Sequence, residues 1–385
     1  MIRKPTVAIT GVGETHEYRR VSDKSNFELV VDSSLKAIED AGLKPEDIDG
    51  ILVNCYEHEY AIDELASAIG ITERRFTASP QSSAGGHTVG GAVLARMAIE
   101  AGQARHVLNP YGLKTSKAGG AYAFHARDPH KAALEMPVGY YGQPIYFAMW
   151  AERYRAEYGL KEEQLGEIAV ACRKWAQLTP GSQKTDAMSM DDYLASPKIA
   201  TPLKNADCCL NTDGSASYVV SSLAEARNMR QKPIVIAGVA LASLPVTLAE
   251  MFTQNPEFLE TAARRSGAIA YAEAGIGPKD LDFAEIYDCF TISVLIQLED
   301  LGMAPRGEGG AFLEGGRMAP GGSLPINTHG GHLSNGYVPG ANHIVEAVRQ
   351  LRGVRGAAQV KNAEIGLVAG LAGNEHATMI LTTDR

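Results

Sequence analysis

The feature that most constrains the fold of this chain is an internal duplication. The segment Ala41–Val53, AGLKPEDIDGILV, recurs as Ala274–Ile286, AGIGPKDLDFAEI. Each copy reads as the end of a helix, a glycine that terminates it, a turn containing proline and an apolar strand. A repeat on this scale predicts two structurally similar halves.

Three further elements recur in the same order: an opening strand, a helix rich in small residues and a closing strand. They are the pairs Val7–Val12 and Ile234–Val239, Gly90–Gly102 and Pro339–Gly353, and Ser215–Ser222 and His376–Thr383. Four matched elements in one order indicate a repeated α/β layered unit. Small residues allow close backbone approach, so we expect the two helices to pack together at the centre.

The first copy carries an insertion ahead of its closing strand. We therefore expect an N-terminal half over 1–113 and 208–226, an inserted loop domain over 114–207 and a C-terminal half over 227–385. The aromatic-rich part of the insertion, 138–159, allows two interpretations. It is either a lid or partner surface, or an amphipathic helix that buries its aromatic side chains.

Composition excludes several classes of protein. The formal net charge of -9 argues against a nucleic-acid binder, which needs a basic surface for phosphates. Five cysteines, odd in number and without zinc-site spacing, favour a reducing compartment. No long apolar segment occurs, and the N-terminus runs straight into a strand pattern, so a cytoplasmic protein without a membrane span is expected.

Several motifs resemble the thiolase superfamily, in its sterol-carrier-protein thiolase-like branch. They are DCFTI (Asp288–Ile292), NTHGGHLSNGYVPGANH (Asn327–His343) and TDGSASYVV (Thr212–Val220). The resemblance covers essentially the whole chain. It implies a duplicated five-layer αβαβα thiolase fold and an acyl-coenzyme A substrate, with coenzyme A as part of the substrate and no separate cofactor. It also implies a homodimer formed by edge strands, and a small OB-fold zinc-ribbon partner protein.

The chain departs from the family at its chemical positions. The two family cysteines correspond to Gly85 and Gly370, the catalytic histidine to Tyr337, and the asparagine of the N-G-G motif to His329. No cysteine lies between Cys55 and Cys172, so a small alignment shift cannot restore the first one. Thiolysis through a cysteine nucleophile is therefore not expected.

The pattern resembles the thiolase-like aldolases that shorten steroid side chains by retro-aldol cleavage, in which two tyrosines replace cysteine and histidine. The matching residues are Tyr287 and Tyr337. We expect Tyr337 to act as base or acid at the reacting hydroxyl, with Tyr287 as its partner. A phenol acting as a base near neutrality needs a cationic or hydrogen-bonding neighbour, and His329 or His343 are the candidates. His329 also stands where an oxyanion donor is expected.

Other site residues follow less directly. The resemblance places Gly331, Gly373 and Ser83 beside the coenzyme A thioester, and Asp288 is expected to cap the helix that follows it. The cations available for the coenzyme A phosphates are Arg74, Arg75, Lys114 and Arg317. His329 and His332 have metal-ligand spacing, but the sequence offers no carboxylate or cysteine to complete a site, so no metal is expected.

Two other functions stay open at this point. One is acyl transfer with a non-cysteine nucleophile such as Ser83, which would need an adjacent base. The other is a non-catalytic subunit that binds acyl-coenzyme A or lipid.

Overall fold

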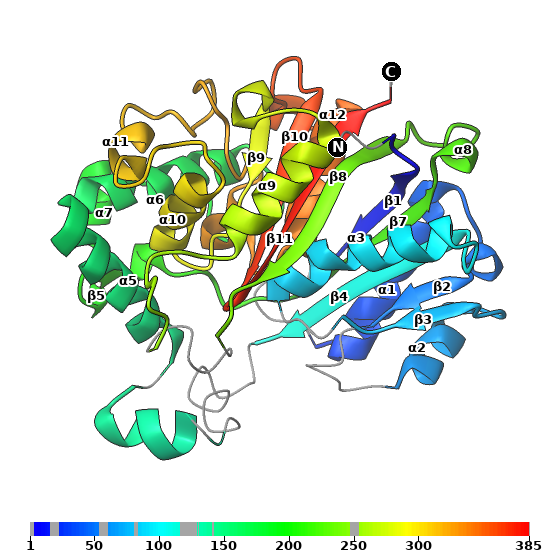
Figure 1. The fold of residues 1–385 in the computed structure, drawn as a ribbon, viewed down its shortest axis with the longest axis horizontal. Coiled ribbons are helices and arrows are strands. Elements are labelled where there is room, and N and C mark those ends of the chain that lie inside the picture. Colours follow the sequence, from blue (N-terminus) through cyan, green and yellow to red (C-terminus); the bar gives the residue numbers. More distant parts are fainter. Residues whose placement is uncertain are drawn as a thin grey trace.

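The computed structural model describes residues 4–15, 23–53, 61–80, 84–115, 129, 131–140, 142–246 and 254–384. Its main element is a nine-stranded mixed sheet in the order β3-β2-β4-β7-β1-β8-β11-β10-β9 (Figure 1). The first half contains β1 (Val7–Glu14), α1 (Asn26–Ala41), η2 (Pro45–Asp47), β2 (Gly50–Leu52), α2 (Ile62–Ile69), β3 (Phe76–Ala78), α3 (Ala84–Glu100), β4 (His106–Lys114), β7 (Asp213–Ser222) and α8 (Leu223–Ala226). The second contains β8 (Ile234–Ser243), α9 (Ala263–Ala274), η7 (Pro278–Asp280), β9 (Phe283–Glu285), α10 (Thr291–Asp300), α11 (Gly309–Leu313), η8 (Gly331–Asn335), α12 (Ala341–Arg352), η9 (Gly356–Ala358), β10 (Ile365–Ala372) and β11 (Glu375–Thr383).

The two halves repeat one another outward from the centre of the sheet. The first runs β1, β7, β4, β2 and the second β8, β11, β10, β9. Strands β1 and β8 pair with each other at the centre, where Ala8 lies opposite Val235. Helices α1 and α9 both end at a glycine in the left-handed region, Gly42 and Gly275, which spares a side chain the steric cost of that conformation. The predicted duplication is confirmed.

Helices α3 and α12 lie between the two half-sheets. Helix α3 packs on β10 and β11 of the second half, and α12 packs on β7 and β1 of the first, whereas α1 and α9 cover their own strands. Thr88 Oγ1 donates to the Pro339 carbonyl across the α3–α12 contact at 2.9 Å. A β-carbon at Gly340 would stand 3.0 Å from the Gly85 Cα. The expected central packing of the two helices and the five-layer fold are confirmed.

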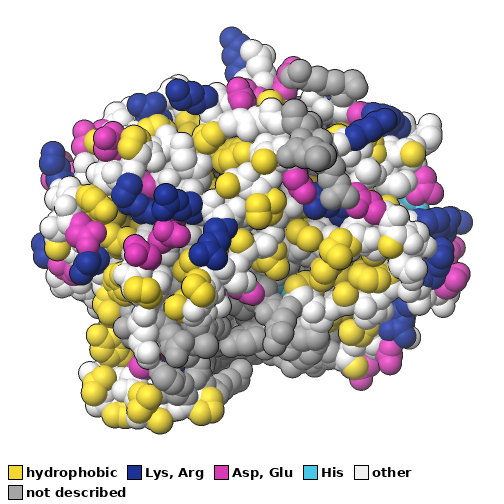
Figure 2. All heavy atoms as spheres, viewed as in Figure 1, with side chains coloured by type: hydrophobic (Ala, Val, Ile, Leu, Met, Phe, Trp, Pro, Cys, Tyr) yellow, Lys and Arg dark blue, Asp and Glu magenta, His cyan; other side chains and the backbone are white. Residues whose placement is uncertain are grey.

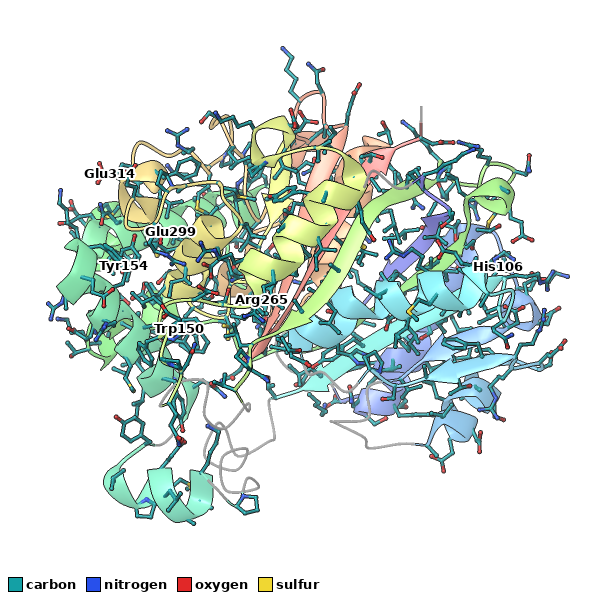
Figure 3. The ribbon with its side chains drawn as sticks, viewed as in Figure 1. His106, Trp150, Tyr154, Arg265, Glu299 and Glu314 are labelled. Carbon is teal, nitrogen blue, oxygen red and sulfur yellow. The ribbon has the colours of Figure 1, made fainter. Side chains whose placement is uncertain are left out.

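The insertion begins after β4 and returns at β7. It contains η4 (Lys131–Glu135), η5 (Met136–Val138), α5 (Gln143–Tyr158), α6 (Glu162–Gln177), α7 (Met190–Ala195), β5 (Lys198–Ala200), β6 (Leu203–Lys204) and η6 (Asn205–Asp207). Although it leaves the first half, its helices α5 and α6 pack on α10 of the second half (Figure 1). Trp150 and Tyr154 of α5 are buried there, and the Tyr154 hydroxyl donates to Glu299 (Figure 3). These aromatic side chains are core residues, so the interpretation as a helix that buries its aromatics holds for them.

Two surface properties bear on the sequence predictions. Within the described ranges, no helix is both long and apolar enough to cross a membrane. Basic, acidic and apolar side chains are interspersed over the face drawn in Figure 2, so that face carries no field of a single sign.

The duplication extends to the closest backbone contacts. Strand β1 crosses α1 at Gly11, where a β-carbon would stand 2.1 Å from the Ala37 carbonyl oxygen. Strand β8 crosses α9 in the same way at Gly238, where the corresponding distance to the Ala270 carbonyl oxygen is 2.2 Å. Real β-carbons do not approach oxygen so closely, so each crossing requires a glycine.

We predict that Gly11→Ala and Gly238→Ala each lower the free energy of unfolding by about 1–3 kcal/mol, because the added methyl group forces the helix away from the sheet. Gly277→Ala is the matched control, because its β-carbon would meet only Asp280 Oδ2, at 3.9 Å. Urea denaturation of the three variants measures the difference. Equal stabilities for all three would contradict the prediction.

Candidate active site

The two positions of the missing cysteines lie back to back. Gly85 begins the buried end of α3, and Gly370 lies in β10. A β-carbon at Gly370 would stand 2.1 Å from the Gly85 carbonyl oxygen, and one at Gly85 would stand 2.8 Å from the Gly370 Cα. The same β-carbon at Gly85 would be 2.6 Å from Cδ2 of Tyr287. The Tyr287 ring therefore fills the space that a cysteine side chain at position 85 would need.

The backbone of Tyr287 is held firmly just beyond β9. The Asn327 side chain brackets the preceding residue, accepting from the Ile286 N–H at 2.7 Å and donating to the Ile286 carbonyl at 2.9 Å. Gln297 Nε2 donates to the Tyr287 carbonyl at 2.7 Å. These bonds fix the ring in its slot against α3, which is the kind of support a reacting side chain requires.

The two tyrosines named from the sequence meet. Their hydroxyl oxygens are 2.7 Å apart, and their rings lie edge to face with centroids 6.4 Å apart. Tyr287 is buried and Tyr337 is half-buried. The Tyr337 N–H donates to Thr212 Oγ1 at 2.7 Å, which anchors the loop to the start of β7. The structure thus forms a hydroxyl dyad with one outer and one inner member.

The inner member resists ionisation. Burial raises the pKa of the Tyr287 hydroxyl well above its ordinary value, and the neighbouring Tyr337 adds to this. Tyr287 therefore keeps its proton near neutral pH. A protonated Tyr287 donates its hydrogen bond to the Tyr337 oxygen, leaving the more exposed oxygen as the one that exchanges a proton with a bound molecule.

The histidine that contacts both tyrosines is His332. Its ring centroid lies 4.9 Å from that of Tyr287 and 5.0 Å from that of Tyr337, edge to face in both cases. Burial lowers the pKa of His332 well below its ordinary value, and His343 and His329 lower it further. The sequence gave His332 no chemical role. It comes between the tyrosines only because residues 331–335 form a tight π-helical turn.

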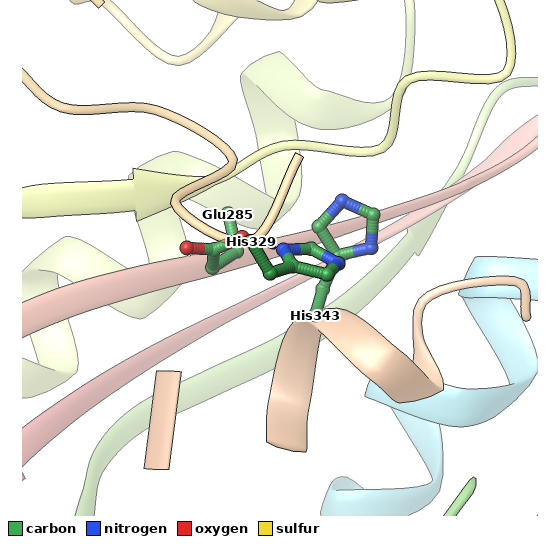
Figure 4. Close-up of side chains that lie close together, drawn as sticks. All are labelled: Glu285, His329 and His343. Atoms are coloured by element: carbon green, nitrogen blue, oxygen red, sulfur yellow. Dashed lines mark ion pairs between the residues drawn. The ribbon is translucent and has the colours of Figure 1, made fainter. Parts of the chain in front are cut away.

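His329 and His343 lie deeper, behind His332. The His329 ring faces Glu285 on one side, with Nδ1 3.2 Å from Oε2, and Asn342 on the other, with Nε2 3.0 Å from Nδ2. His343 is fully buried on α12, with Nε2 3.3 Å from Asp288 Oδ1. Figure 4 shows Glu285, His329 and His343 gathered together. Their measured contacts are with core groups, and the expectation that one of them neighbours the tyrosine dyad places the role on the wrong histidine.

Asp288 does not cap α10, contrary to the prediction. That helix begins at Thr291, its N-cap residue is Phe290, and no side chain caps it. The Asp288 carboxylate instead accepts the backbone N–H groups of His332 at 2.9 Å and Leu333 at 3.3 Å. It therefore holds the turn that carries His332, which is a tertiary contact that local spacing cannot reveal.

Cysteines near the site do not replace the missing nucleophile. Cys172, Cys209 and Cys289 surround the segment that contains Asp288, and burial raises the pKa of all three thiols, that of Cys289 to about 12. A thiol with so high a pKa carries almost no thiolate near neutrality, and the thiolate is the nucleophile. Cys55, by contrast, lies outside the described residues.

The residues predicted to bind coenzyme A fall in different places. Gly331 is buried with a φ of 59°, and a β-carbon there would stand 2.0 Å from Asp288 Oδ2, so its glycine is required by the protein's own packing. Gly373 has a φ of 60° in the turn between β10 and β11. Ser83 lies outside the described residues. The role of all three at the thioester stays a prediction.

The four candidate cations each contact other protein groups. Arg74 pairs with Asp63 at 2.6 Å, and Arg75 donates to the Gly102 carbonyl at 3.1 Å. Lys114 pairs with Asp213 at 3.2 Å, and Arg317 donates to the Phe312 carbonyl at 2.6 Å. These contacts do not single out one of the four for a phosphate.

The fold and the tyrosine dyad in place of two cysteines define a thiolase-like protein without thiolase chemistry. Residues 246–383 match the thiolase C-terminal domain-like family. The chain is 35% identical to the steroid side-chain-cleaving aldolase of Thermomonospora curvata, over 90% of both chains. It therefore belongs to the thiolase superfamily, in the sterol-carrier-protein thiolase-like branch that includes such aldolases.

Other relatives agree. The chain is 34% identical to the 17-hydroxy-3-oxo-4-pregnene-20-carboxyl-CoA lyase of Mycobacterium tuberculosis, over 90% of this chain and 91% of that one. Its fold matches a solved Ltp2-ChsH2(DUF35) aldolase with a TM-score of 0.91 and 33% identity, over 99% and 98% of the two chains. An acetyl-CoA acetyltransferase from Syntrophomonas wolfei shares the fold at a TM-score of 0.70 and 15% identity. The predicted thiolase fold and family are confirmed.

We predict that Gly85→Ala lowers the free energy of unfolding by about 1–3 kcal/mol, because the methyl group overlaps the Tyr287 ring. In a Tyr287→Ala background the same substitution should cost less, since one of its two clashes is removed. A double-mutant cycle in urea measures the coupling. Strictly additive effects would mean that the ring does not occupy this space.

Proposed function

We propose that this chain is a carbon–carbon lyase that cleaves a 3-hydroxyacyl-coenzyme A by retro-aldol chemistry. The observation that carries the proposal is the Tyr287–Tyr337 hydroxyl pair, 2.7 Å apart, beside the two glycines at the family's cysteine positions. The relatives that are most similar in the comparisons carry the names aldolase and lyase. Together these favour proton transfer without a covalent acyl-enzyme.

The reaction balances with this pair alone. Tyr337 accepts the proton of the substrate's 3-hydroxyl group, and the C3–O bond becomes a carbonyl as the bond between C2 and C3 breaks. The electrons of that bond form the enolate of the shortened thioester, and a proton returned to C2 completes it. A ketone or aldehyde and a shorter acyl-coenzyme A leave, with no net change in protons.

Each tyrosine has its own part in this scheme. Tyr337 is the half-buried member and exchanges the proton with the substrate. Tyr287, kept protonated by burial, donates a hydrogen bond to the Tyr337 oxygen and stabilises it when it loses its proton. His332 packs its ring against both and keeps them in register.

The acyl group that we propose is a steroid side chain or a related branched acyl chain with a hydroxyl group on C3. The support is the name of the Mycobacterium tuberculosis relative, whose substrate has a 17-hydroxyl group two carbons from the thioester carbonyl. A tertiary hydroxyl of this kind leaves a ketone on cleavage. The residues lining the acyl pocket give no independent choice between steroidal and other chains.

We predict that Tyr337→Phe and Tyr287→Phe each lower kcat by about 10²–10⁴-fold, the usual contribution of a positioned acid or base. The assay follows ketone release from a tertiary 3-hydroxyacyl-coenzyme A, with the relative's 17-hydroxy steroid thioester as first substrate. Tyr271→Phe is the matched control, since its buried hydroxyl forms no hydrogen bond. Full activity in Tyr337→Phe would overturn the proposed role.

The other two functions give different outcomes in the same experiment. An acyl-enzyme seen by intact mass after substrate addition would favour acyl transfer through a non-cysteine nucleophile. Tight binding of acyl thioesters without turnover of any would favour a non-catalytic binding subunit.

We also propose that the chain forms a homodimer through β3. This strand is at the end of the sheet, and its Phe76 N–H and Ala78 carbonyl face β2, bonding Asp49 and Val53. Strand groups alternate in direction, so the backbone of Thr77 points away from β2, where a second copy could pair with it.

A small OB-fold zinc-ribbon protein is the second proposed partner. The solved aldolase most like this chain in the comparisons carries two names, Ltp2 and ChsH2(DUF35). In this chain, Leu134 and Val138 of the projecting segment η4–η5 are 62% and 71% exposed. Figure 2 shows apolar side chains gathered at the lower end of the molecule, where Figure 1 places this segment. An exposed apolar group of this kind suits a protein contact.

We predict a mass in solution of twice the chain's 41.1 kDa, measured by light scattering after size exclusion. Thr77→Pro should give the monomer mass, because it removes the outward N–H of β3 but none of its bonds to β2. Ser67→Pro is not a usable control, since it breaks a helix, so Thr77→Val serves instead and should remain dimeric. A monomeric wild-type chain with full activity would contradict the prediction, and added zinc-ribbon protein tests the second partner by the same measurement.

A further inference from the structure

The core behind the tyrosine dyad holds two carboxylates without a basic partner. Glu285 and Asp288 have fully buried side chains, and their ion pairs within the described part of the chain are with histidines alone. The adjacent Glu346 differs, because Arg355 pairs with it at 2.7 Å. Buried carboxylates need a compensating cation, since the cost of removing each from water is several kcal/mol.

The amide of Asn342 fixes the protons of two histidines. The Gly336 carbonyl can only accept, so the Asn342 atom 2.9 Å from it is the amide nitrogen. That nitrogen also lies 3.0 Å from His329 Nε2, which therefore accepts, and the neutral His329 ring carries its proton on Nδ1, facing Glu285. A proton in that position leaves no lone pair there for a metal. This excludes Glu285 and His329 as the primary ligands, although they lie close enough to His343 to form a site (Figure 4).

The other side of the same amide gives the opposite result. The Asn342 oxygen lies 3.2 Å from His332 Nε2, so this nitrogen carries the proton. The Gly340 N–H also approaches Nε2, but at the longer distance of 3.4 Å. A neutral His332 therefore presents the lone pair of Nδ1, which is 3.1 Å from Asp288 Oδ1. Its lowered pKa keeps the ring neutral.

Three acceptor atoms then converge. Asp288 Oδ1 lies 3.1 Å from His332 Nδ1 and 3.3 Å from His343 Nε2, and the three atoms lie within 4.8 Å of one another. These are hydrogen-bond distances, yet neither ring nitrogen forms a hydrogen bond. Lone pairs directed at a common point beside the carboxylate oxygen explain this. The separations also match the edge of a tetrahedron, about 3.3 Å for metal–ligand bonds of about 2.0–2.1 Å.

We propose that Asp288, His332 and His343 bind a divalent transition-metal ion of the zinc type. Two imidazoles and one carboxylate are a ligand set that such ions favour. The ion supplies the positive charge that the two buried carboxylates lack. Glu285 lies behind His343, where a carboxylate commonly orients a metal-binding histidine. The sequence concealed the site because its carboxylate comes from the segment after β9, more than forty residues before the histidines.

The ion ties three elements together. Asp288 follows β9, His332 belongs to η8 and His343 to α12, and the first two flank the segments that carry Tyr287 and Tyr337. The ion is thus a brace for the dyad's supporting loops. The proposal does not depend on the reaction that the dyad catalyses.

The test uses the full chain, purified without chelator. We expect about one equivalent of metal per chain by elemental analysis, and a melting temperature that falls by about 5 °C after removal with dipicolinate and recovers with Zn²⁺. Co²⁺ added to the stripped protein should give the visible absorption bands of a tetrahedral site. His343→Gln should abolish these bands, whereas His106→Gln, a buried histidine of β4 that contacts Ser221, should keep them.

Three outcomes would overturn the proposal. They are a wild-type protein with only trace metal whose melting temperature ignores Zn²⁺, stripped protein without Co²⁺ bands, and His343→Gln that retains the bands. Protons rather than a metal would then balance the carboxylates. If His343→Gln does not fold, the wild-type Co²⁺ titration and melting curves decide.

Discussion

The contact between the backbones of α3 and β10 at Gly85 and Gly370 governs this site. Neither position has room for a β-carbon, because each lies against the other's main chain. The close approach brings the start of α3 within reach of the Tyr287 ring, which then packs where a nucleophile would stand. Loss of the cysteines and gain of an inner tyrosine are therefore two aspects of one packing arrangement, and the chemistry follows from it.

The sequence was sufficient for the fold and for the dyad. The repeat at Ala41–Val53 and Ala274–Ile286 fixed the order of helices and strands, because glycine terminators and apolar strands are local signals. Tyr287 and Tyr337 could be paired because the family resemblance aligned both. The thiolase fold and aldolase family were correctly predicted on the same basis.

The supporting polar groups could not be predicted. Asp288 reads as a helix cap, yet its carboxylate turns to the N–H groups of His332 and Leu333, more than forty residues away in sequence. His332 and His329 are three residues apart in one glycine-rich run, and only the π-helical turn decides which ring meets the tyrosines. Side-chain direction in such a turn depends on tertiary contacts and leaves no periodic trace in the sequence.

The placement of the insertion has a consequence for how the chain folds. Helix α5 belongs by sequence to the first half, but its buried Trp150 and Tyr154 pack against α10, with Tyr154 bonded to Glu299, 145 residues further on. During synthesis, which proceeds from the N-terminus, these aromatic side chains emerge long before the surface that covers them. The first half thus cannot finish folding as an independent unit, and the nascent chain carries an exposed aromatic face until the second half is made.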